Sequence, residues 1–344
     1  MKQFLAILSF IFFFFSCSGG AEEVVAEESN QIDTVVAIDS MTYFNQKVDA
    51  NPKSSDWRYK RAVFLLAKGD VPQSKYDLEQ ALRLDSVNMD ARLMYANLHL
   101  SMTNLDTSKF HYEYILEKDT ANTGALIGLS KLYALLDNPA AANAHISTAL
   151  EINPNLAEAY FMRGIIYRTD YYDTGRKESW DRAVSSFQTT VEQDPDYYSA
   201  YIEMGVMYDQ IKSDLALEYY NSALDIYPES QETWYNIGMY HQTRGEVDQA
   251  LTAYKKINAI DSTWADPYYN QGYIHLVLTE KLDSAIHYLI LATDRDPMYF
   301  QAYNNLGLAY ELSGDIPNAK KYYQKAIDAN PDFQLAKDNL NSLR

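Results

Sequence analysis

The sequence predicts an all-α protein in which about eight helix pairs follow one another and stack into a solenoid. Small residues recur at intervals of about 34 residues along most of the 344-residue chain, the period typical of repeated helix–turn–helix units. Within a period the apolar residues follow helical spacing, and turn residues such as Ser313–Asp315 separate two helices. An Asp or Asn before Pro, Ser or Thr closes seven of the eight periods. Because each unit would contact mainly its neighbours, the array should form a stack with a concave face.

The chain begins with an apolar leader, and residues 1–16 are predicted to be a signal peptide. The apolar run Phe4–Phe15 is too short for a comfortable membrane span and suits the hydrophobic part of a signal peptide. Cys17 is the only cysteine, so it cannot form an internal disulfide. A small residue before Cys17 resembles the lipobox of bacterial lipoproteins, although Phe14 and Phe15 depart from its usual residues. The resemblance implies that Cys17 is lipidated; a plain signal peptide and an uncleaved anchor remain alternatives.

Residues 17–35 are predicted to form a flexible acidic tether. Small and acidic residues dominate this segment, and no basic residue occurs between Cys17 and Lys47, so like charges repel within it. Acidic residues soon after a lipidated cysteine also resemble the surface-export signal of some Gram-negative lipoproteins. The next segment, residues 36–54, is predicted to be an orphan helix and turn that continue the stack, with Phe44 facing inward.

The eight periods place the same kinds of residue at the same positions. The first helix of a period holds a small residue such as Gly307, Gly272 or Gly238, and the second holds one such as Ala319. A bulkier side chain there would overpack the helix contact, at about 1–3 kcal/mol. The pattern resembles the tetratricopeptide repeat, which implies a right-handed α-α superhelix. The predicted units are 55–88, 89–122, 123–156, 157–197, 198–230, 231–264, 265–299 and 300–333.

Two segments depart from the regular period. The unit 157–197 contains about seven extra residues around Thr169–Trp180, and these are expected to lengthen the loop between its two helices. The last segment, residues 334–344, is predicted to be a helix that caps the final repeat and covers its apolar face.

The resemblance implies that first helices line a concave groove that binds protein or peptide ligands. The groove positions are largely apolar and aromatic, with two cations near the middle, which suits an extended or helical segment with apolar anchors. For the tyrosines, simple packing within the repeat is an equally open interpretation. The predicted groove residues are Tyr59, Asn97, Lys131, Phe161, Arg168, Ile202, Tyr235, Met239, Tyr269, Tyr273, Asn304 and Leu308.

Composition and motifs argue against several other classes of function. The formal net charge of −18 disfavours nucleic-acid binding, which needs Lys and Arg to neutralise phosphate. No phosphate-binding loop, HExxH or GxSxG motif occurs, so no catalytic residue, cofactor or metal is predicted. His99, His241 and His275 share one repeat position, too far apart to share a metal. Tyr59 stands where the carboxylate-clamp subset of the family needs Lys, so a receptor for chaperone tails is disfavoured.

These observations predict a non-catalytic, lipid-anchored scaffold of the bacterial cell envelope that binds partner proteins or peptides through its groove. The expected location is the outer membrane, on the periplasmic side or the cell surface, with membrane attachment through the N-terminal lipid. The alternative is an adaptor that regulates an envelope enzyme such as a peptidoglycan hydrolase. A carbohydrate-binding lipoprotein is a third, weaker hypothesis, because the groove is aromatic but its polar residues are scattered.

Overall fold

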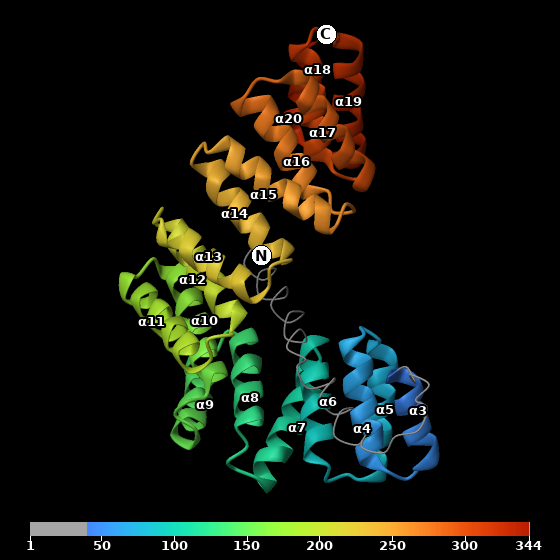
Figure 1. Ribbon diagram of the computed structural model, residues 1–344, viewed down its shortest axis with the longest axis vertical. Helices are drawn as coiled ribbons and strands as arrows, with labels where there is room; N and C mark the ends of the chain where they lie inside the picture. Colours follow the sequence, from blue (N-terminus) through green and yellow to red (C-terminus); the bar gives the residue numbers. More distant parts are fainter. Residues whose placement is uncertain (1–39, 344) are drawn as a thin grey trace, which may run out of the picture. The chain divides into compact units, whose positions relative to one another are not determined.

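The computed structural model describes residues 40–343, and every element in that range is helical. The predicted signal peptide, Cys17, the tether and residues 36–39 lie outside the described residues. The chain divides into two compact units, an N-terminal unit that ends at Asp194 and a C-terminal unit that begins at Pro195 (Figure 1). Each unit is built from consecutive antiparallel helix pairs, in agreement with the all-α class predicted from the sequence.

The N-terminal unit opens with the orphan helix and continues with four helix pairs. Phe44 of the orphan helix is buried and packs against Phe64, with ring centroids 5.1 Å apart, so it faces the stack as predicted. The elements are α3 (Ser40–Ala50), α4 (Ser55–Ala67), α5 (Val71–Leu84), α6 (Met89–Ser101), α7 (Leu105–Lys118), α8 (Thr123–Leu135), α9 (Pro139–Ile152), α10 (Ala157–Thr174) and α11 (Lys177–Gln193).

The C-terminal unit repeats the same arrangement and ends with a short helix. Ala336 of that last helix is fully buried and packs with Tyr303 and Ala326 of the final pair. The elements are α12 (Tyr198–Gln210), α13 (Leu215–Ile226), α14 (Gln231–Thr243), α15 (Val247–Ile260), α16 (Asp266–Tyr273) with its π-helical continuation η2 (Ile274–Leu278), α17 (Leu282–Arg295), α18 (Phe300–Leu312), α19 (Ile316–Ala329) and α20 (Gln334–Ser342).

The recurrent glycines lie where a first helix meets a large side chain of its partner helix. A Cβ atom added to Gly238 would stand 2.5 Å from Cε1 of Tyr254, and one added to Gly307 would stand 2.6 Å from Cδ1 of Tyr323. Real Cβ atoms do not approach other atoms so closely, because repulsion rises steeply below van der Waals contact. The predicted role of these small residues in close helix packing is therefore confirmed.

The Asp or Asn that closes most periods makes a specific turn. In at least six periods its side chain accepts a hydrogen bond from the backbone N–H two residues later, as Asp296 does from Met298 at 2.8 Å. Such turns offer the backbone a local partner and so stop a helix. The short side chain therefore sets both the end of the second helix and the start of the next unit.

The longest helix pair corrects one prediction. The extra residues of unit 157–197 extend α10 to 18 residues and α11 to 17, and only Gly175 and Arg176 separate the two helices. Gly175 has φ of 68° and its N–H bonds to the carbonyl of Tyr171, the left-handed helix ending that glycine favours. Because no such stop occurs earlier, the insertion continues as helix and the loop is not lengthened.

Within residues 40–343, no helix combines the length and the apolar character that crossing a membrane would require.

Candidate functional site

A cavity of about 450 Å³ opens in the N-terminal unit between its first helices. It is lined by residues of α6, α8 and α10, together with Asp137 in the turn after α8 and Pro139 at the start of α9. Three predicted groove residues, Asn97, Lys131 and Arg168, meet there. The apolar part of the lining comes from Leu100, Ala134, Leu135, Met162, Ile165 and Ile166.

The polar residues of this cavity are held by neighbours. Lys131 forms an ion pair with Glu158 across α8 and α10, with Nζ and Oε1 2.6 Å apart. The hydroxyl of Tyr112 donates a hydrogen bond to Oδ1 of Asn97 at 2.6 Å, which orients the amide. Arg168 is largely buried and its guanidinium lies 5.7 Å from the ring centre of Tyr172. Because neighbouring residues hold these side chains in place, the cavity has its shape before any ligand binds.

Sequence reasoning missed the acidic wall of the cavity. Asp170, Asp173 and Thr174 line it from the extended end of α10, and Asp137 lines it from the turn after α8. The repeat alignment gave no position to the inserted residues, although the acids in Thr169–Trp180 were visible in the sequence. Three of these four residues therefore depend on the helical extension of α10, where a longer loop was predicted.

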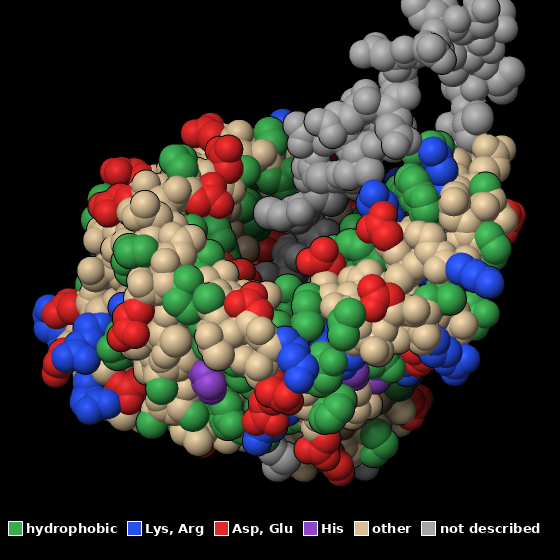
Figure 2. All heavy atoms as spheres, turned by 90° about the horizontal axis from the view of Figure 1, so that it is seen from below, with side chains coloured by type: hydrophobic (Ala, Val, Ile, Leu, Met, Phe, Trp, Pro, Cys, Tyr) green, Lys and Arg blue, Asp and Glu red, His purple; other side chains and the backbone are tan. Residues whose placement is uncertain are grey.

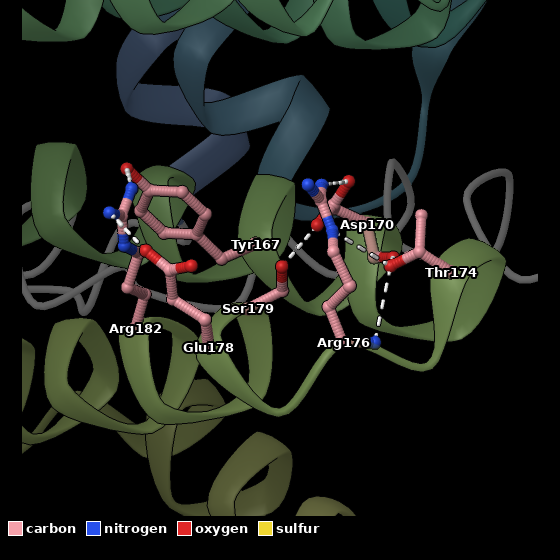
Figure 3. A network of polar contacts seen from close by, with 7 residues as sticks. All are labelled: Tyr167, Asp170, Thr174, Arg176, Glu178, Ser179 and Arg182. Carbon is pink, nitrogen blue, oxygen red and sulfur yellow. Dashed lines mark hydrogen bonds and ion pairs between the residues drawn. The ribbon is translucent and has the colours of Figure 1, made fainter.

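Asp170 is the best-anchored acid of this wall (Figure 3). Its carboxylate accepts a hydrogen bond from the Ser179 hydroxyl of α11 and pairs with Arg176, with Oδ1 and Nη2 2.5 Å apart. These contacts lower the pKa of Asp170, the Ser179 hydrogen bond first and the Arg176 contacts after it. The arrangement keeps Asp170 ionised and joins the ends of α10 and α11.

Three predicted groove residues are buried in the core, and their assignment to the groove was wrong. Phe161 is 0% exposed and packs against Phe187, and Ile202 is 6% exposed within the core of the C-terminal unit. Successive helical residues point about 100° apart, so Met162 lines the cavity while Phe161, one residue earlier, faces α11. Asn304 is 3% exposed, and its Oδ1 accepts a hydrogen bond from Nδ2 of Asn339 in α20 at 3.0 Å.

The predicted tyrosines of the C-terminal unit lie in an aromatic cluster. Tyr269 stacks on Tyr299 at 4.9 Å and lies 6.5 Å from Tyr273, and its hydroxyl accepts a hydrogen bond from Asn305 at 3.2 Å. Tyr235 packs on Trp264 at 5.1 Å. Burial is the largest cause of the raised pKa of both Tyr235 and Tyr269. These contacts favour the packing interpretation of the cluster, whose members Tyr299 and Trp264 the first-helix mapping did not include.

The remaining predicted positions are half-buried. Tyr59 packs against the core between α4 and α6, and burial is the first cause of its raised pKa, followed by Asp90 and Asp56. Met239 contacts Nδ2 of Asn270 through its sulfur at 3.9 Å, and Leu308 packs beside Leu276 and Ala309. None of these three is among the residues that line the cavity of the N-terminal unit.

The three histidines that share a repeat position have separate local partners or surroundings. His99 is buried beside Tyr95, Nδ1 of His241 lies 2.5 Å from Glu246, and Nδ1 of His275 lies 3.1 Å from Thr279. In the part of the chain that the structure describes, no group of three or more His, Cys, Asp or Glu is placed to hold a metal ion. On the face shown in Figure 2, acidic, basic and hydrophobic side chains are interspersed.

Comparison with curated proteins gives relatives of moderate identity. The chain is 26% identical over 202 residues to BBSome complex member BBS4 of Bos taurus, covering 58% of this chain and 37% of that protein. It is 29% identical over 198 residues to tetratricopeptide repeat protein 8 of Caenorhabditis elegans, covering 57% of this chain and 38% of that protein. The chain therefore spans less than two fifths of the length of these two relatives.

Two solved structures share the fold at low sequence identity. The Cut9 structure, solved as the APC/C hetero-tetramer Cut9-Hcn1, aligns with a TM-score of 0.56 at 14% identity, over 88% of this chain and 58% of that one. The human IFIT1 dimer with m7Gppp-AAAA aligns with a TM-score of 0.57 at 17% identity, over 85% of this chain and 67% of that one. At this identity the likeness concerns the fold alone.

Family models described as tetratricopeptide repeat match residues 172–230, 231–263 and 300–333. The helix pairs outside these segments pack in the same consecutive order, and in the pair α16 and α17 a small residue of the first helix, Gly272, lies against a large one of the second, Leu289. On these matches and this shared architecture, the chain is a tetratricopeptide-repeat protein.

Proposed function

We propose that this protein is a non-catalytic scaffold that binds a segment of a partner protein in the cavity of its N-terminal unit. The observation that carries the proposal is the cavity itself, about 450 Å³, with an apolar lining and convergent polar side chains. Cavities of this size and character are the usual binding sites of folded domains. Its walls come from three consecutive first helices, so a bound segment would contact three repeats at once.

The named assemblies among similar proteins agree with this role. The bovine relative is a member of the BBSome complex, and the Cut9 structure is that of a hetero-tetramer. Those partners belong to those proteins, and the proposal takes from them only the general role of a repeat array in an assembly.

Membrane attachment through a lipid on Cys17 and a location in the bacterial cell envelope form the second part of the proposal. They rest on the lipobox-like residues and the short apolar leader. Cys17→Ala should move the protein from the membrane fraction to the soluble fraction and abolish labelling by a clickable fatty-acid analogue. Equal membrane association of the variant would overturn the lipid anchor.

Capture of partners tests the binding role. Ala134 lines the cavity, whereas Ala144 is exposed on the neighbouring helix α9 and is not part of the cavity. Ala134→Arg should fill the cavity and remove partners that co-purify with the native protein, while the matched Ala144→Arg should retain them. If both variants retain the same partners, the cavity is not the binding site.

The adaptor hypothesis concerns the identity of the same partner. It requires that a captured protein be an envelope enzyme, such as a peptidoglycan hydrolase, and that its rate change when the scaffold is added. An unchanged rate of the purified enzyme would exclude the adaptor hypothesis, and the scaffold role would remain as the proposal.

A further inference from the structure

One side of the cavity is formed by residues of α10 that have no counterpart in the other first helices of this unit. Helices α4, α6 and α8 each contain 13 residues, whereas α10 contains 18. Three lining residues, Asp170, Asp173 and Thr174, belong to the added turns of α10. The insertion therefore changes the binding surface directly, by adding one side to it.

The added side makes the lining acidic. Four carboxylates, those of Asp137, Glu158, Asp170 and Asp173, line the cavity against the two cations Lys131 and Arg168. Glu158 is paired with Lys131, and Asp170 is held by Arg176 and Ser179. Asp137 and Asp173 are exposed, and neither forms an ion pair with another described residue.

The position of Asp137 is fixed by the backbone. It follows α8 in the left-handed region, with φ of 54°, and its N–H bonds to the carbonyl of Ala134. Short polar side chains such as Asp and Asn are the residues other than glycine that adopt this conformation most readily. The carboxylate therefore stands at a defined point on the rim, beside the apolar lining from Ala134 and Leu135.

We infer that the cavity selects a partner segment that carries a Lys or Arg beside an apolar anchor. The apolar side chain would enter between Leu135, Met162 and Ile165, and the cation would lie at the rim near Asp137 and Asp173. Opposite charges across an interface fix orientation and reject wrong partners. This inference rests on the proposed function and adds the chemical class of its ligand.

The acidic charge of the rim also favours a separate partner chain, rather than the protein's own N-terminal segment, as the bound ligand. Residues 18–39 contain only acidic charges and no Lys or Arg. Like charges at an acidic rim oppose binding of that segment, whereas a basic segment is attracted. A separate partner chain with basic residues is therefore the occupant that the cavity fits.

Three probe peptides test the inference on the full-length protein. They share one leucine anchor and differ only in the two flanking residues, which are Lys, Ser or Glu, and binding is followed by fluorescence anisotropy. We expect the Lys probe to bind about tenfold more tightly than the Glu probe, with the Ser probe between them. The preference should weaken as ionic strength rises, because salt screens exposed charges.

Two double variants test whether Asp137 and Asp173 cause the preference for the Lys probe. Asp137→Asn/Asp173→Asn should abolish most of the preference, and asparagine keeps the left-handed backbone at position 137. Glu151→Gln/Glu192→Gln removes the same charge from exposed positions outside the cavity on α9 and α11 and should leave the preference intact. A thermal melt of each variant confirms folding.

Equal binding of the Lys and Glu probes, tighter binding of the Glu probe, or no binding of any probe would overturn the inference. The inference would also be overturned if the Glu151/Glu192 variant lost the preference for the Lys probe as fully as the Asp137/Asp173 variant. The proposed function is judged separately, because capture of native partners by Ala134→Arg and Ala144→Arg does not depend on the charge of a probe.

Discussion

At the scale of single residues, helix packing in this protein depends on glycine facing an aromatic ring. Replacing Gly238 by Ala would normally stabilise a helix by about 1 kcal/mol, but the new Cβ would stand 2.5 Å from the Tyr254 ring. We expect Gly238→Ala to cost about 1–3 kcal/mol, the usual range for overpacking, measured by urea unfolding. Gly124→Ala is the control, because its Cβ would come too close only to the movable end of Leu93, at 2.7 Å, and would lie at an ordinary contact distance of 3.4 Å from Oδ1 of Asn122. A Gly238→Ala protein as stable as the native one would contradict the packing account.

A second residue-scale feature is the buried carboxylate of Asp77. It is 0% exposed and pairs with Arg61 through two hydrogen bonds of 2.6 and 2.7 Å and with Arg58 at 3.0 Å. Arg61 also donates to Asn45 of α3 at 2.9 Å, so the cluster joins the orphan helix to the first repeat. The Asp77 hydrogen bond is the main cause of the raised pKa of Arg61.

Removing this carboxylate should be costly because two cations would lose their partner. We expect Asp77→Ala to destabilise the N-terminal unit by about 3–5 kcal/mol and to loosen α3, seen as faster hydrogen exchange over residues 40–50. Asp56→Ala breaks only the exposed pair with Lys60 and should cost less than about 1 kcal/mol. Similar losses for the two variants would mean that the Asp77 cluster has no special structural role.

At the scale of elements, the pair α6 and α7 contains a half-buried histidine, His111, whose ring nitrogen faces an arginine. Nη1 of Arg92 lies 2.9 Å from Nδ1 of His111, and an arginine can only donate, so that nitrogen accepts. Burial first, then Arg92 and His99, lowers the pKa of His111 from 6.5 to about 4. Since the unfolded chain takes up the proton first, the stabilising contribution is full above pH 6.5 and is lost as the pH falls toward about 4.

His111→Gln should therefore flatten the pH dependence of stability in this range. The amide does not titrate, so the difference in unfolding free energy between native protein and variant should shrink as the pH falls from 6.5 to about 4. Carboxylates titrate in both proteins and cancel in the comparison. Parallel stability curves for the two proteins would show that His111 titrates normally.

Element boundaries also show what the sequence could and could not predict. The period and the sizes of the residues at fixed positions recur many times in the chain. They were enough to predict the helix pairs, the inward Phe44 and the close packing at Gly238 and Gly307. The end of α10 depended on a single insertion, where only Gly175 gives a stop signal. At the cavity, Asn97, Lys131 and Arg168 were found from repeat position alone.

The failures at the site have a physical cause in helix geometry. Neighbouring residues on a helix differ by about 100° in direction. An assignment that is wrong by one residue therefore places a core side chain in the groove. Phe161 and Ile202 were assigned to the groove although they are core residues, and the acids of the α10 extension had no counterpart in other repeats. Asn304 bonds to Asn339, which lies in the capping helix outside the eight aligned units.

At the scale of the whole molecule, stability should be local because each repeat contacts mainly its neighbours. The final pair, α18 and α19, is covered by α20, whose contacts include Ala336 with Tyr303 and Asn339 with Asn304. Phe333, just before α20, packs on Phe300 at 4.8 Å. Deleting residues 333–344 therefore uncovers one side of the last repeat and leaves the N-terminal unit's own contacts unchanged.

We expect this deletion to increase hydrogen exchange mainly in α18 and α19, with the effect fading toward α12 and no change over residues 40–194. Local opening energies vary along a chain in this way when cooperative units are small. Hydrogen exchange with mass spectrometry measures each segment separately, and Leu335→Ala, which truncates an exposed side chain of α20, provides the control. If protection falls equally in both units, unfolding is a single cooperative event. The nearest-neighbour description of this array would then be wrong, because loss of a terminal helix could reach the N-terminal unit only through such cooperativity.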